Sequence, residues 1–422
     1  MSRAIEISNE ETCTSRLHIN TARQIIYQDC QCAVPHEITG LRKSLNRITA
    51  EALTSPINVP PYTNSAVDGY AVGYDYLIPE GNFYKAKIAG TAWAGNPYQG
   101  TVEPGTAIRI MTGAVMPAAT DTVVMQENTA VHGPYIYFDT RACKVGENVR
   151  AAGEDLAEGS TALAKGKRLT AADLGLLASI GIDKFNCYRK LRVGFFSTGN
   201  ELRSVGQPLN KGEIYDSNRY TLFGMLQDLH MDIVDLGVIK DDRAALADAL
   251  STITEQCDAV ITTGGVSVGD ADYMRQVIGN NGDIYFWQVA IKPGRPLVYG
   301  RINNTPFFGL PGNPVAVMVT FYQFVQQALM LLAGSEEIPS SPTFKARSGN
   351  SFRKKPGRTE FQRAIVQTQS NGETWVHSTG KQGSGILRSM SEANCFVVLP
   401  HDSHGAKEGD WVDVQPFNGM IR

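Results

Sequence analysis

Short apolar runs alternate with helical patterns between Leu191 and Gly334. The apolar runs predict strands at 191–197, 232–239, 258–263, 283–291 and 306–310. Stretches with helical spacing follow most of these runs, at 216–231, 242–257, 270–279 and 314–333. Strands that alternate with helices predict a mostly parallel, doubly wound α/β sheet. Because ligands of such sheets bind beyond the carboxyl ends of the strands, we expect a functional site at that edge.

The remaining chain predicts three further parts. Apolar spacing from Thr12 to Glu51 predicts two helices, and a helical pattern returns over 169–180. Residues between these stretches are rich in Gly, Pro, Val, Ile and Tyr, which favours a β-rich module. The C-terminal residues alternate like strands, with Asn371-Gly372 as a hairpin turn, and predict a small β-barrel. The predicted α/β multidomain protein therefore has a discontinuous helical linker domain (1–60 and 146–190), an inserted β-rich module (61–145), the α/β domain (191–335) and a C-terminal β-barrel domain (340–422).

Composition excludes several classes of partner. The 39 basic and 42 acidic residues give a formal net charge of -3, so no global field attracts nucleic acid or a membrane. The seven cysteines are scattered and contain no C-x-x-C pair, which favours a reducing, cytoplasmic compartment. The N-terminus lacks the order of a signal peptide. The most membrane-like stretch, Pro314 to Ala333, carries its polar residues on one helical stripe, which predicts a buried helix.

The loop after the predicted strand 258–263 has the composition of an anion-binding loop. The strand leads into Thr262 to Gly265, and Asp270 then opens a helical stretch, so backbone N–H groups can face a ligand. Neither the dinucleotide-binding nor the P-loop signature fits this spacing. In a neighbouring strand-end turn, Lys292 has little packing purpose as a cation and therefore suits an oxyanion or phosphate.

Carboxylates gather just beyond the predicted strand ends, at Glu201, Asp241, Asp242, Asp270 and Asp272. Clustered carboxylates repel one another, and a hard cation such as Mg²⁺ relieves that repulsion while it bridges substrate phosphates. Asp242 and Asp270 are equally well explained as helix N-caps that need no metal. We therefore predict Glu201, Asp241 and Asp272 as the metal ligands.

Three other polar stretches have a structural explanation beside a functional one. Asn313 before Pro314 is a good helix start, with an N-cap followed by a first-turn proline. The same holds for the triplet Asp216 to Asn218 before the next predicted helix. The basic stretch 345–363 is either a solvated face or an anion-binding surface.

A competing motif overlaps the glycine-rich loop. Residues 265–269 match G-x-S-x-G, the nucleophile elbow of α/β-hydrolases, with Ser267 as the nucleophile. A hydrolase then needs an acid and a histidine later in the chain, and His377, His401 and His404 all lie in the predicted barrel. A serine hydrolase therefore stays an alternative.

Eight motifs follow one another in order, and together they are very specific although each alone is weak. They are Pro60 to Ala71, Ile110 to Ala114, Gly153 to Asp155, Ser197 to Leu202, Asp216 to Asn218, Thr263 to Asp270, Lys292 to Gly294 and Leu310 to Pro314. From about residue 12 to its C-terminus, the chain thereby resembles the MoeA family of molybdopterin molybdenumtransferases, whose eukaryotic relatives include the C-terminal part of gephyrin.

The resemblance implies the last step of molybdenum cofactor biosynthesis. Adenylylated molybdopterin binds with Mg²⁺, molybdate enters the dithiolene sulfurs, the adenylate bond is cleaved and AMP leaves. It also implies a homodimer in which the β module of one subunit closes the α/β site of the other. Asp68 and Thr112 then act across the subunit interface.

The resemblance also implies individual roles. The implied catalytic residues are Asp68, Glu201, Asp241, Asp272 and Lys292. The implied substrate-binding residues are Thr112, Arg150, Asp155, Ser217, Thr263, Gly264, Gly265, Ser267, Arg295, Pro311 and Ser384. Asp155 is expected to orient Arg150, and Ser384 to reach the site from the barrel. One departure is Gln288, where relatives commonly place a lysine, which leaves the attraction of molybdate to Lys292 and Arg295.

Two further alternatives remain open at this point. A molybdopterin adenylyltransferase-like enzyme shares the Thr-Gly-Gly loop but does not need the β module and the barrel. A non-catalytic scaffold keeps the fold without turnover. The resemblance further implies transient contacts with the molybdopterin adenylyltransferase and with molybdoenzyme apoproteins.

Overall fold

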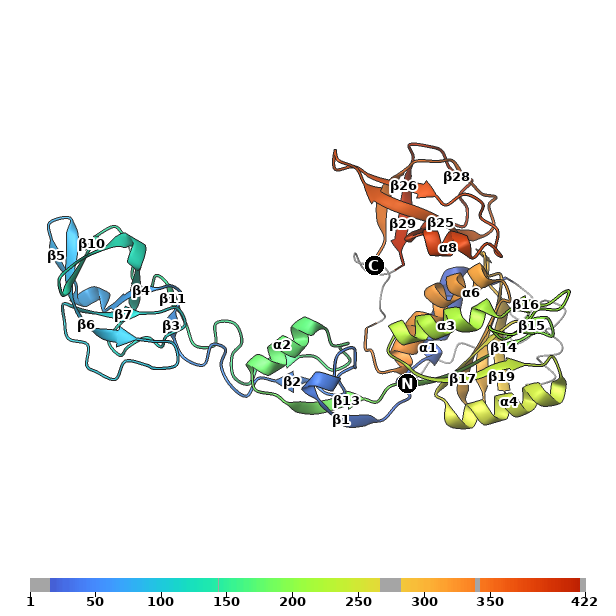
Figure 1. The fold of residues 1–422 in the computed structure, drawn as a ribbon, viewed down its shortest axis with the longest axis horizontal. Coiled ribbons are helices and arrows are strands. Elements are labelled where there is room, and N and C mark those ends of the chain that lie inside the picture. Colours follow the sequence, from blue (N-terminus) through green and yellow to red (C-terminus); the bar gives the residue numbers. More distant parts are fainter. Residues whose placement is uncertain (1–15, 143, 266–281, 338–341, 418–422) are drawn as a thin grey trace.

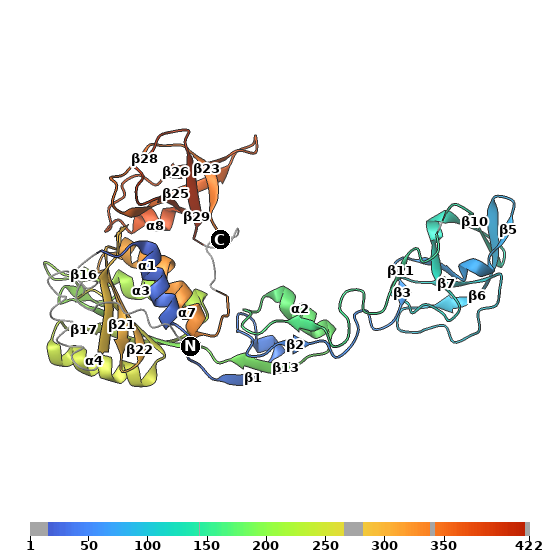
Figure 2. The ribbon, with the colours of Figure 1, turned by 180° about the vertical axis from the view of Figure 1, so that it is seen from behind.

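The computed structural model describes residues 16–142, 144–265, 282–337 and 342–417. Figure 1 shows an elongated molecule with the β module at one end, a narrow linker domain in the middle, and the α/β domain at the other end. The C-terminal barrel lies beside the α/β domain in both views (Figures 1 and 2). The predicted α/β multidomain fold is confirmed. The helix predicted at 270–279 lies outside the described residues.

A six-stranded sheet forms the centre of the α/β domain. Its order is β17 (Asp232–Ile239), β14 (Arg192–Thr198), β18 (Ala259–Thr263), β22 (Thr305–Leu310), β21 (Pro296–Ile302) and β19 (Gly282–Gln288). The first four strands are parallel, and β21 is antiparallel to both of its neighbours. The short pair β15 (Leu202–Arg203) and β16 (Ile214–Tyr215) extends from this region. The sheet therefore presents the carboxyl ends of β14, β18 and β22 at one edge.

Helices cover both faces of this sheet. One face packs against α1 (Ile19–Asp29), α3 (Ser217–Asp228), α6 (Pro314–Thr320), a π-helical turn (Phe321–Val325) and α7 (Gln326–Leu332), and the other against α4 (Arg243–Gln256). Neighbouring strand residues alternate between the two layers: Phe195 packs in the first core and Phe196 in the second. Both phenylalanine side chains are fully buried. This two-sided burial explains the near-continuous apolar runs in the sequence.

The predicted pair of helices over Thr12 to Glu51 is wrong in its second half. Among the described residues of this range, α1 is the only α-helix, and the residues after it form β1 (His36–Gly40) and the 3-10 turn η1 (Leu41–Lys43). Pro35 and the β-branched Ile38 and Thr39 favour extended backbone there. α1 itself belongs to the core of the α/β domain, since Ile26 is fully buried among sheet residues.

The linker domain is therefore built mostly from short strands. β1 pairs with β13 (Lys184–Tyr188), and β2 (Leu53–Thr54) pairs with β12 (Thr161–Leu163). Its one helix within the described residues, α2 (Ala171–Ser179), starts with a capping box formed by Thr170 and Asp173. These two-strand ribbons connect the α/β domain to the β module.

A seven-stranded sheet forms within the region of the predicted insertion. Its strands are β4 (Gly69–Val72), β5 (Ile78–Glu80), β6 (Phe83–Ala92), β7 (Thr106–Ile110), β8 (Thr122–Met125), β9 (Thr129–His132) and β10 (Tyr135–Asp139), with 3-10 turns η2 (Tyr74–Tyr76) and η3 (Gln126–Asn128). The chain enters and leaves the module side by side, because β3 (Asn64–Ser65) pairs with β11 (Val149–Arg150).

The C-terminal domain is a small closed barrel with one short helix. Its elements are β23 (Phe344–Ser348), β24 (Phe352–Arg353), β25 (Thr359–Thr368), β26 (Thr374–Ser378), α8 (Arg388–Glu392), β27 (Cys395–Leu399), β28 (Gly405–Ala406) and β29 (Trp411–Pro416). β25 pairs with both β26 and β27, which closes the barrel. The predicted hairpin at Asn371-Gly372 joins β25 to β26. A strand of the α/β domain, β20 (Ile291–Lys292), pairs with β25 and fastens the two domains together.

One helical run, Pro314–Leu332, is long and apolar enough to cross a membrane by length and composition. Its most apolar window is 83% buried inside the structure. The prediction of a buried helix for this stretch is therefore confirmed.

Candidate active site

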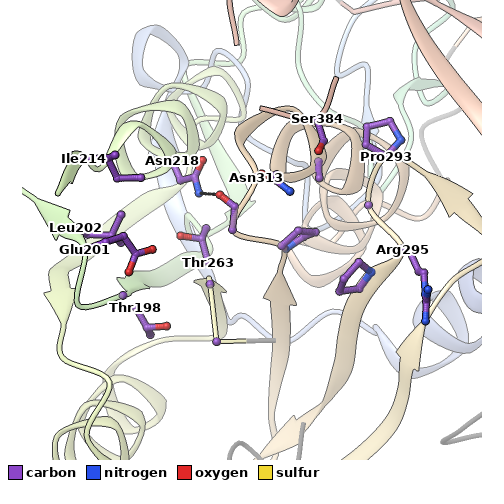
Figure 3. Close-up of a pocket in the computed structure, with 18 of the residues that line it drawn as sticks. Thr198, Glu201, Leu202, Ile214, Asn218, Thr263, Pro293, Arg295, Asn313 and Ser384 are labelled. Carbon is purple, nitrogen blue, oxygen red and sulfur yellow. Dashed lines mark hydrogen bonds between the residues drawn. The ribbon is translucent and has the colours of Figure 1, made fainter. Parts of the chain in front are cut away.

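A cavity of about 1030 Å³ opens at the carboxyl-end edge of the sheet. Its walls come from the ends of β14, β18 and β22, from the turn between β20 and β21, and from the barrel. The cavity brings together these residues that the sequence indicated: Glu201, Asp241, Thr263, Gly264, Gly265, Lys292, Arg295, Pro311 and Ser384. Figure 3 shows Thr198, Glu201, Leu202, Ile214, Asn218 and Thr263 on one side of it, and Pro293, Arg295 and Ser384 on the other.

The double glycine after β18 is required by its surroundings. Gly264 and Gly265 have φ angles of 84° and 64°, in the left-handed region that side chains disfavour. A Cβ atom on Gly264 would lie 2.4 Å from the backbone oxygen of Thr198, so no side chain fits. Thr263 donates its hydroxyl to Ser197 at 3.1 Å and thereby links β18 to β14. The loop consequently presents bare backbone to the cavity.

Two unpaired carboxylates mark one end of the cavity. Glu201 and Asp241 are both exposed there, and neither forms an ion pair within the described part of the chain. Asp242 instead caps α4 by accepting a hydrogen bond from the N–H of Ala245 at 2.9 Å, as its alternative explanation predicted. Among the described residues, no group of three or more His, Cys, Asp or Glu side chains is placed to hold a metal. The predicted third ligand, Asp272, lies outside the described residues.

Cationic groups line the opposite end. Lys292, Arg295 and Arg358 all face the cavity, and Ser384 joins them from the barrel. Ser384 is held there because its carbonyl accepts the N–H of Val315 in the first turn of α6, at 3.1 Å. This end therefore offers several N–H and O–H donors, which suits an oxyanion.

The expectation that Lys292 has little packing purpose is wrong. Its Nζ lies 3.2 Å from both carboxylate oxygens of Glu360, whose side chain is only 3% exposed. The pairing of β20 with β25 places the two residues side by side. Lys292 therefore serves the contact between the domains and also faces the cavity, where its side chain is 46% exposed.

The basic stretch 345–363 divides into structural residues and one cavity residue. Lys345 pairs with Asp413, and Lys354 donates to three backbone carbonyls. Arg363 is buried and donates to Ser389 and Gly383, and this burial lowers the pKa of its guanidinium to about 10. Arg358 is the member of this stretch that lines the cavity, so the predicted anion-binding alternative applies to this residue alone.

Gln288 has a defined role at this end. Its Oε1 accepts a hydrogen bond from Nε of Arg295 at 3.0 Å. A lysine at this position has no acceptor to offer. The departure from the lysine expected in relatives therefore removes one cation but holds another in place.

The remaining predicted contacts lie far from the cavity within this chain. Asp68 and Thr112 belong to the β module at the opposite end of the molecule (Figure 1). Oδ1 of Asp68 accepts the backbone N–H of Thr112 at 2.7 Å and its hydroxyl at 2.8 Å, and these bonds lower the pKa of the Asp68 carboxyl. Arg150 and Asp155 are exposed, and no ion pair joins them in the described chain, so the expected orientation of Arg150 is not formed.

The start of α3 corrects one predicted contact. Asp216 caps the helix by accepting the N–H of Arg219 at 3.1 Å. Ser217, the predicted substrate contact, does not line the cavity, whereas Asn218 does. Asn313, at the start of α6, also lines the cavity and makes no side-chain capping bond. The sequence feature that could have indicated Asn218 is its position in the first turn of a helix that begins at the carboxyl-end edge of the sheet.

The hydrolase alternative gains no support from the described residues. Ser267 lies outside them. Within the described chain, no histidine lines the cavity. His401 instead pairs with Asp402 at 2.8 Å beside a different cleft.

Comparisons with known proteins agree with this geometry along the whole chain. Three family models match: the MoeA N-terminal region (domain I and II) at residues 17–181, a probable molybdopterin binding domain at 194–330, and the MoeA C-terminal region (domain IV) at 345–417. A crystal structure of the molybdopterin biosynthesis moeA protein from Pyrococcus horikoshii has a TM-score of 0.82 and 28% identity, over 96% of this chain and 100% of that one.

Curated relatives match over similar lengths. The molybdopterin molybdenumtransferase of Haemophilus influenzae is 40% identical over 405 residues, which are 96% of this chain and 100% of the relative. That of Bacillus subtilis is 33% identical over 384 residues, 90% of this chain and 89% of the relative. Gephyrin of Dictyostelium discoideum is 30% identical over 93% of this chain and 61% of its own length. The fold, the cavity and these matches together show that the chain belongs to the MoeA family of molybdopterin molybdenumtransferases.

Proposed function

We propose that this protein inserts molybdenum into adenylylated molybdopterin and releases AMP, as the final step of molybdenum cofactor biosynthesis. The observation that carries the proposal is the charge arrangement of one cavity. Glu201 lies on one side of the cavity and Arg295 on the other (Figure 3), and Asp241, Lys292, Arg358 and the two glycines after β18 also line it. A substrate that combines phosphates with a site for an oxyanion matches these three parts.

The carboxylate end fits Mg²⁺. Glu201 and Asp241 are oxygen ligands without a cation partner among the described residues, and hard cations prefer such ligands. Asp272 comes after the glycine-rich loop that follows β18 in the sequence, and it completes the proposed ligand set. Bound Mg²⁺ would neutralise charge on the substrate phosphates. The protein's own part is to hold the two carboxylates at fixed strand ends, so that a phosphate approaches only with its cation.

The glycine loop and the cationic end divide the two anions of the reaction. The N–H of Gly264 donates to the carbonyl oxygen of Leu310 at 3.2 Å, so we assign the phosphates to the backbone N–H of Gly265, which carries no side chain. Molybdate, as the second substrate, suits the end with Lys292, Arg295 and Arg358, because three cationic side chains line the cavity there. This separation keeps the incoming oxyanion apart from the phosphates that repel it.

A homodimer supplies the residues that one chain leaves distant. Large apolar side chains are exposed beside the cavity on the β15–β16 segment and α3, and such a patch favours a protein contact. These residues are Val205, Leu209, Ile214, Tyr215, Tyr220 and Phe223. We infer that the β module of a second subunit covers this side, so that its Asp68 and Thr112 complete the site. Cytoplasmic location and brief contacts with the adenylyltransferase and the molybdoenzyme apoproteins follow from the same role.

The test is AMP release from adenylylated molybdopterin in the presence of Mg²⁺ and molybdate. The proposal expects release that depends on both additions. Asp68→Ala, Asp241→Ala and Asp272→Ala each reduce it by about 100-fold or more, since each removes a group that positions charge. Ser267→Ala keeps a substantial part of it. Full activity in the three aspartate variants, or loss with Ser267→Ala alone, contradicts the assignment.

A further inference from the structure

Asn218 uses the two ends of its side-chain amide differently. The residue is 7% exposed and lines the cavity. Its Nδ2 donates to the carbonyl oxygen of Gly312 at 2.8 Å, the bond drawn in Figure 3. Its Oδ1 is buried and has no hydrogen-bond partner among the described residues. Because a backbone carbonyl can only accept, the nitrogen must face Gly312, and the free end of the amide is the oxygen.

A buried acceptor without a donor costs free energy that a ligand can recover. Thr198, also in the cavity wall, has a buried hydroxyl without a partner in the described chain. A hydroxyl can rotate to donate or to accept, so Thr198 does not indicate what the ligand offers. Asn218 does indicate it, since its free oxygen needs a hydrogen-bond donor or a cation. Glu201 and Asp241 already supply the proposed cation site, so we assign a hydrogen-bond donor to Asn218.

The surroundings narrow the part of the substrate that meets Asn218. Leu202 and Ile214 lie on the same side of the cavity as Asn218, away from Arg295 and Ser384 (Figure 3). Ionised phosphate and molybdate oxygens only accept hydrogen bonds, so neither satisfies the Asn218 oxygen. A ring with apolar faces and N–H or O–H groups at its edge satisfies both the oxygen and the apolar side chains.

We propose that Asn218 is a substrate-binding residue whose Oδ1 accepts a hydrogen bond from an N–H or O–H group of the organic part of the substrate. Leu202 and Ile214 pack against the ring faces. The inference rests on the proposed function, since the pterin and the adenosine of adenylylated molybdopterin both carry such donors. In this arrangement the organic part of the substrate binds on the side of the cavity that holds Asn218, and the oxyanion binds at the cationic end.

Two variants distinguish the contribution of the free Asn218 oxygen to substrate binding from that of the hydrogen bond to Gly312. Asn218→Leu removes both ends of the amide at similar volume, whereas Asn218→Asp keeps an acceptor, loses the donor and adds a negative charge. We expect Asn218→Leu to weaken the binding of adenylylated molybdopterin by about 10-fold to 100-fold, and Asn218→Asp by less than about 5-fold. Binding of molybdate alone stays unchanged in Asn218→Leu, and any loss of it in Asn218→Asp measures the effect of the added charge. Thermal unfolding checks that each variant is folded, and Asn218→Ala replaces the leucine variant if that one is not.

AMP serves as the probe that distinguishes the two sources of the donor. If the leucine variant weakens AMP as strongly as the full substrate, the donor is on the adenosine. If AMP binding is unchanged, the donor is on the pterin. Both results support the proposal.

Other results overturn it. Two results mean that Asn218 only holds the Gly312 turn. One is equal losses of substrate affinity in the leucine and aspartate variants, once the effect of the added charge is subtracted, and the other is a loss of molybdate binding in the leucine variant. Wild-type affinity in the leucine variant removes any role. A wild-type protein that binds adenylylated molybdopterin but releases no AMP refutes the proposed function and leaves the assignment of Asn218 intact.

Discussion

The β module and the α/β domain hold their acidic residues in different ways. Asp68 in the β module accepts two hydrogen bonds from Thr112, although it lies far from the cavity of its own chain. Glu201 and Asp241 in the α/β domain line that cavity and have no ion-pair partner in the described chain. A carboxylate that is fixed in position before it meets a ligand suits a group that closes a site from another subunit. Unpaired carboxylates suit a site that waits for a cation.

Gly264→Ala is expected to have the largest effect on activity, and it changes the α/β domain alone. The added Cβ would lie 2.4 Å from the oxygen of Thr198, so the loop must shift away from the cavity. We expect AMP release to fall by about 100-fold, as for other small displacements of binding groups. Gly409→Ala is the matched control, because Gly409 has nearly the same φ, 85°, and nothing within 4 Å of its added Cβ. It should cost about 1 kcal/mol of stability and no activity. Similar activities of the two variants would contradict the role of the loop.

Glu360→Gln tests the cationic end, with a smaller effect. It removes the carboxylate that lies 3.2 Å from Lys292, so more of the positive charge acts on the cavity. Equilibrium dialysis should show molybdate binding that is about threefold to tenfold tighter. Asp413→Asn releases Lys345, which does not line the cavity, and should leave molybdate binding as it is. Weaker binding in Glu360→Gln would show that the ion pair, and not the cation alone, forms the anion site.

Thr112→Val has the smallest expected effect and acts on the β module alone. It removes the hydroxyl bond to Asp68 and keeps the backbone bond, so the pKa of Asp68 should rise toward the usual value of an aspartate side chain. A carboxyl with a lowered pKa stabilises the fold above its unfolded pKa and loses that contribution as pH falls through the folded value. The change therefore appears in an NMR titration in the acid range, and activity near neutral pH keeps its pH profile. Asp139, whose pKa Arg141 lowers to about 2, is the internal control. An unchanged Asp68 titration would mean that the hydroxyl bond does not form in solution.

The sequence predicted those parts of the site that depend on local pattern. β17 spans the predicted residues 232–239, β14 is shifted by one residue at each end, and β18 begins one residue late and ends as predicted, because two-sided burial gives uninterrupted apolar runs. Their ends place Glu201, Thr263 and Gly264 at the cavity as expected. Strand β21 was missed because it starts at a proline and pairs in a hairpin within the predicted run of parallel strands.

Long-range contacts could not be predicted in the same way. Lys292 meets Glu360 from 68 residues away through a pairing of two domains, and nothing local indicates that contact. α1 joins the α/β core although the linker domain and the β module follow it in sequence. The role of Asn218 depends on which amide atom faces Gly312, which only the folded structure decides.

A subunit-mixing experiment tests the central claim, that one site is assembled from two chains. Asp68→Ala and Asp241→Ala subunits are each inactive as homodimers, and they are coexpressed with different tags so that mixed dimers can be purified and counted. If Asp68 acts across the interface, each mixed dimer contains one intact site, and a random mixture recovers about one quarter of wild-type AMP release. If folded mixed dimers are abundant but release AMP no faster than the two inactive homodimers, the claim is contradicted.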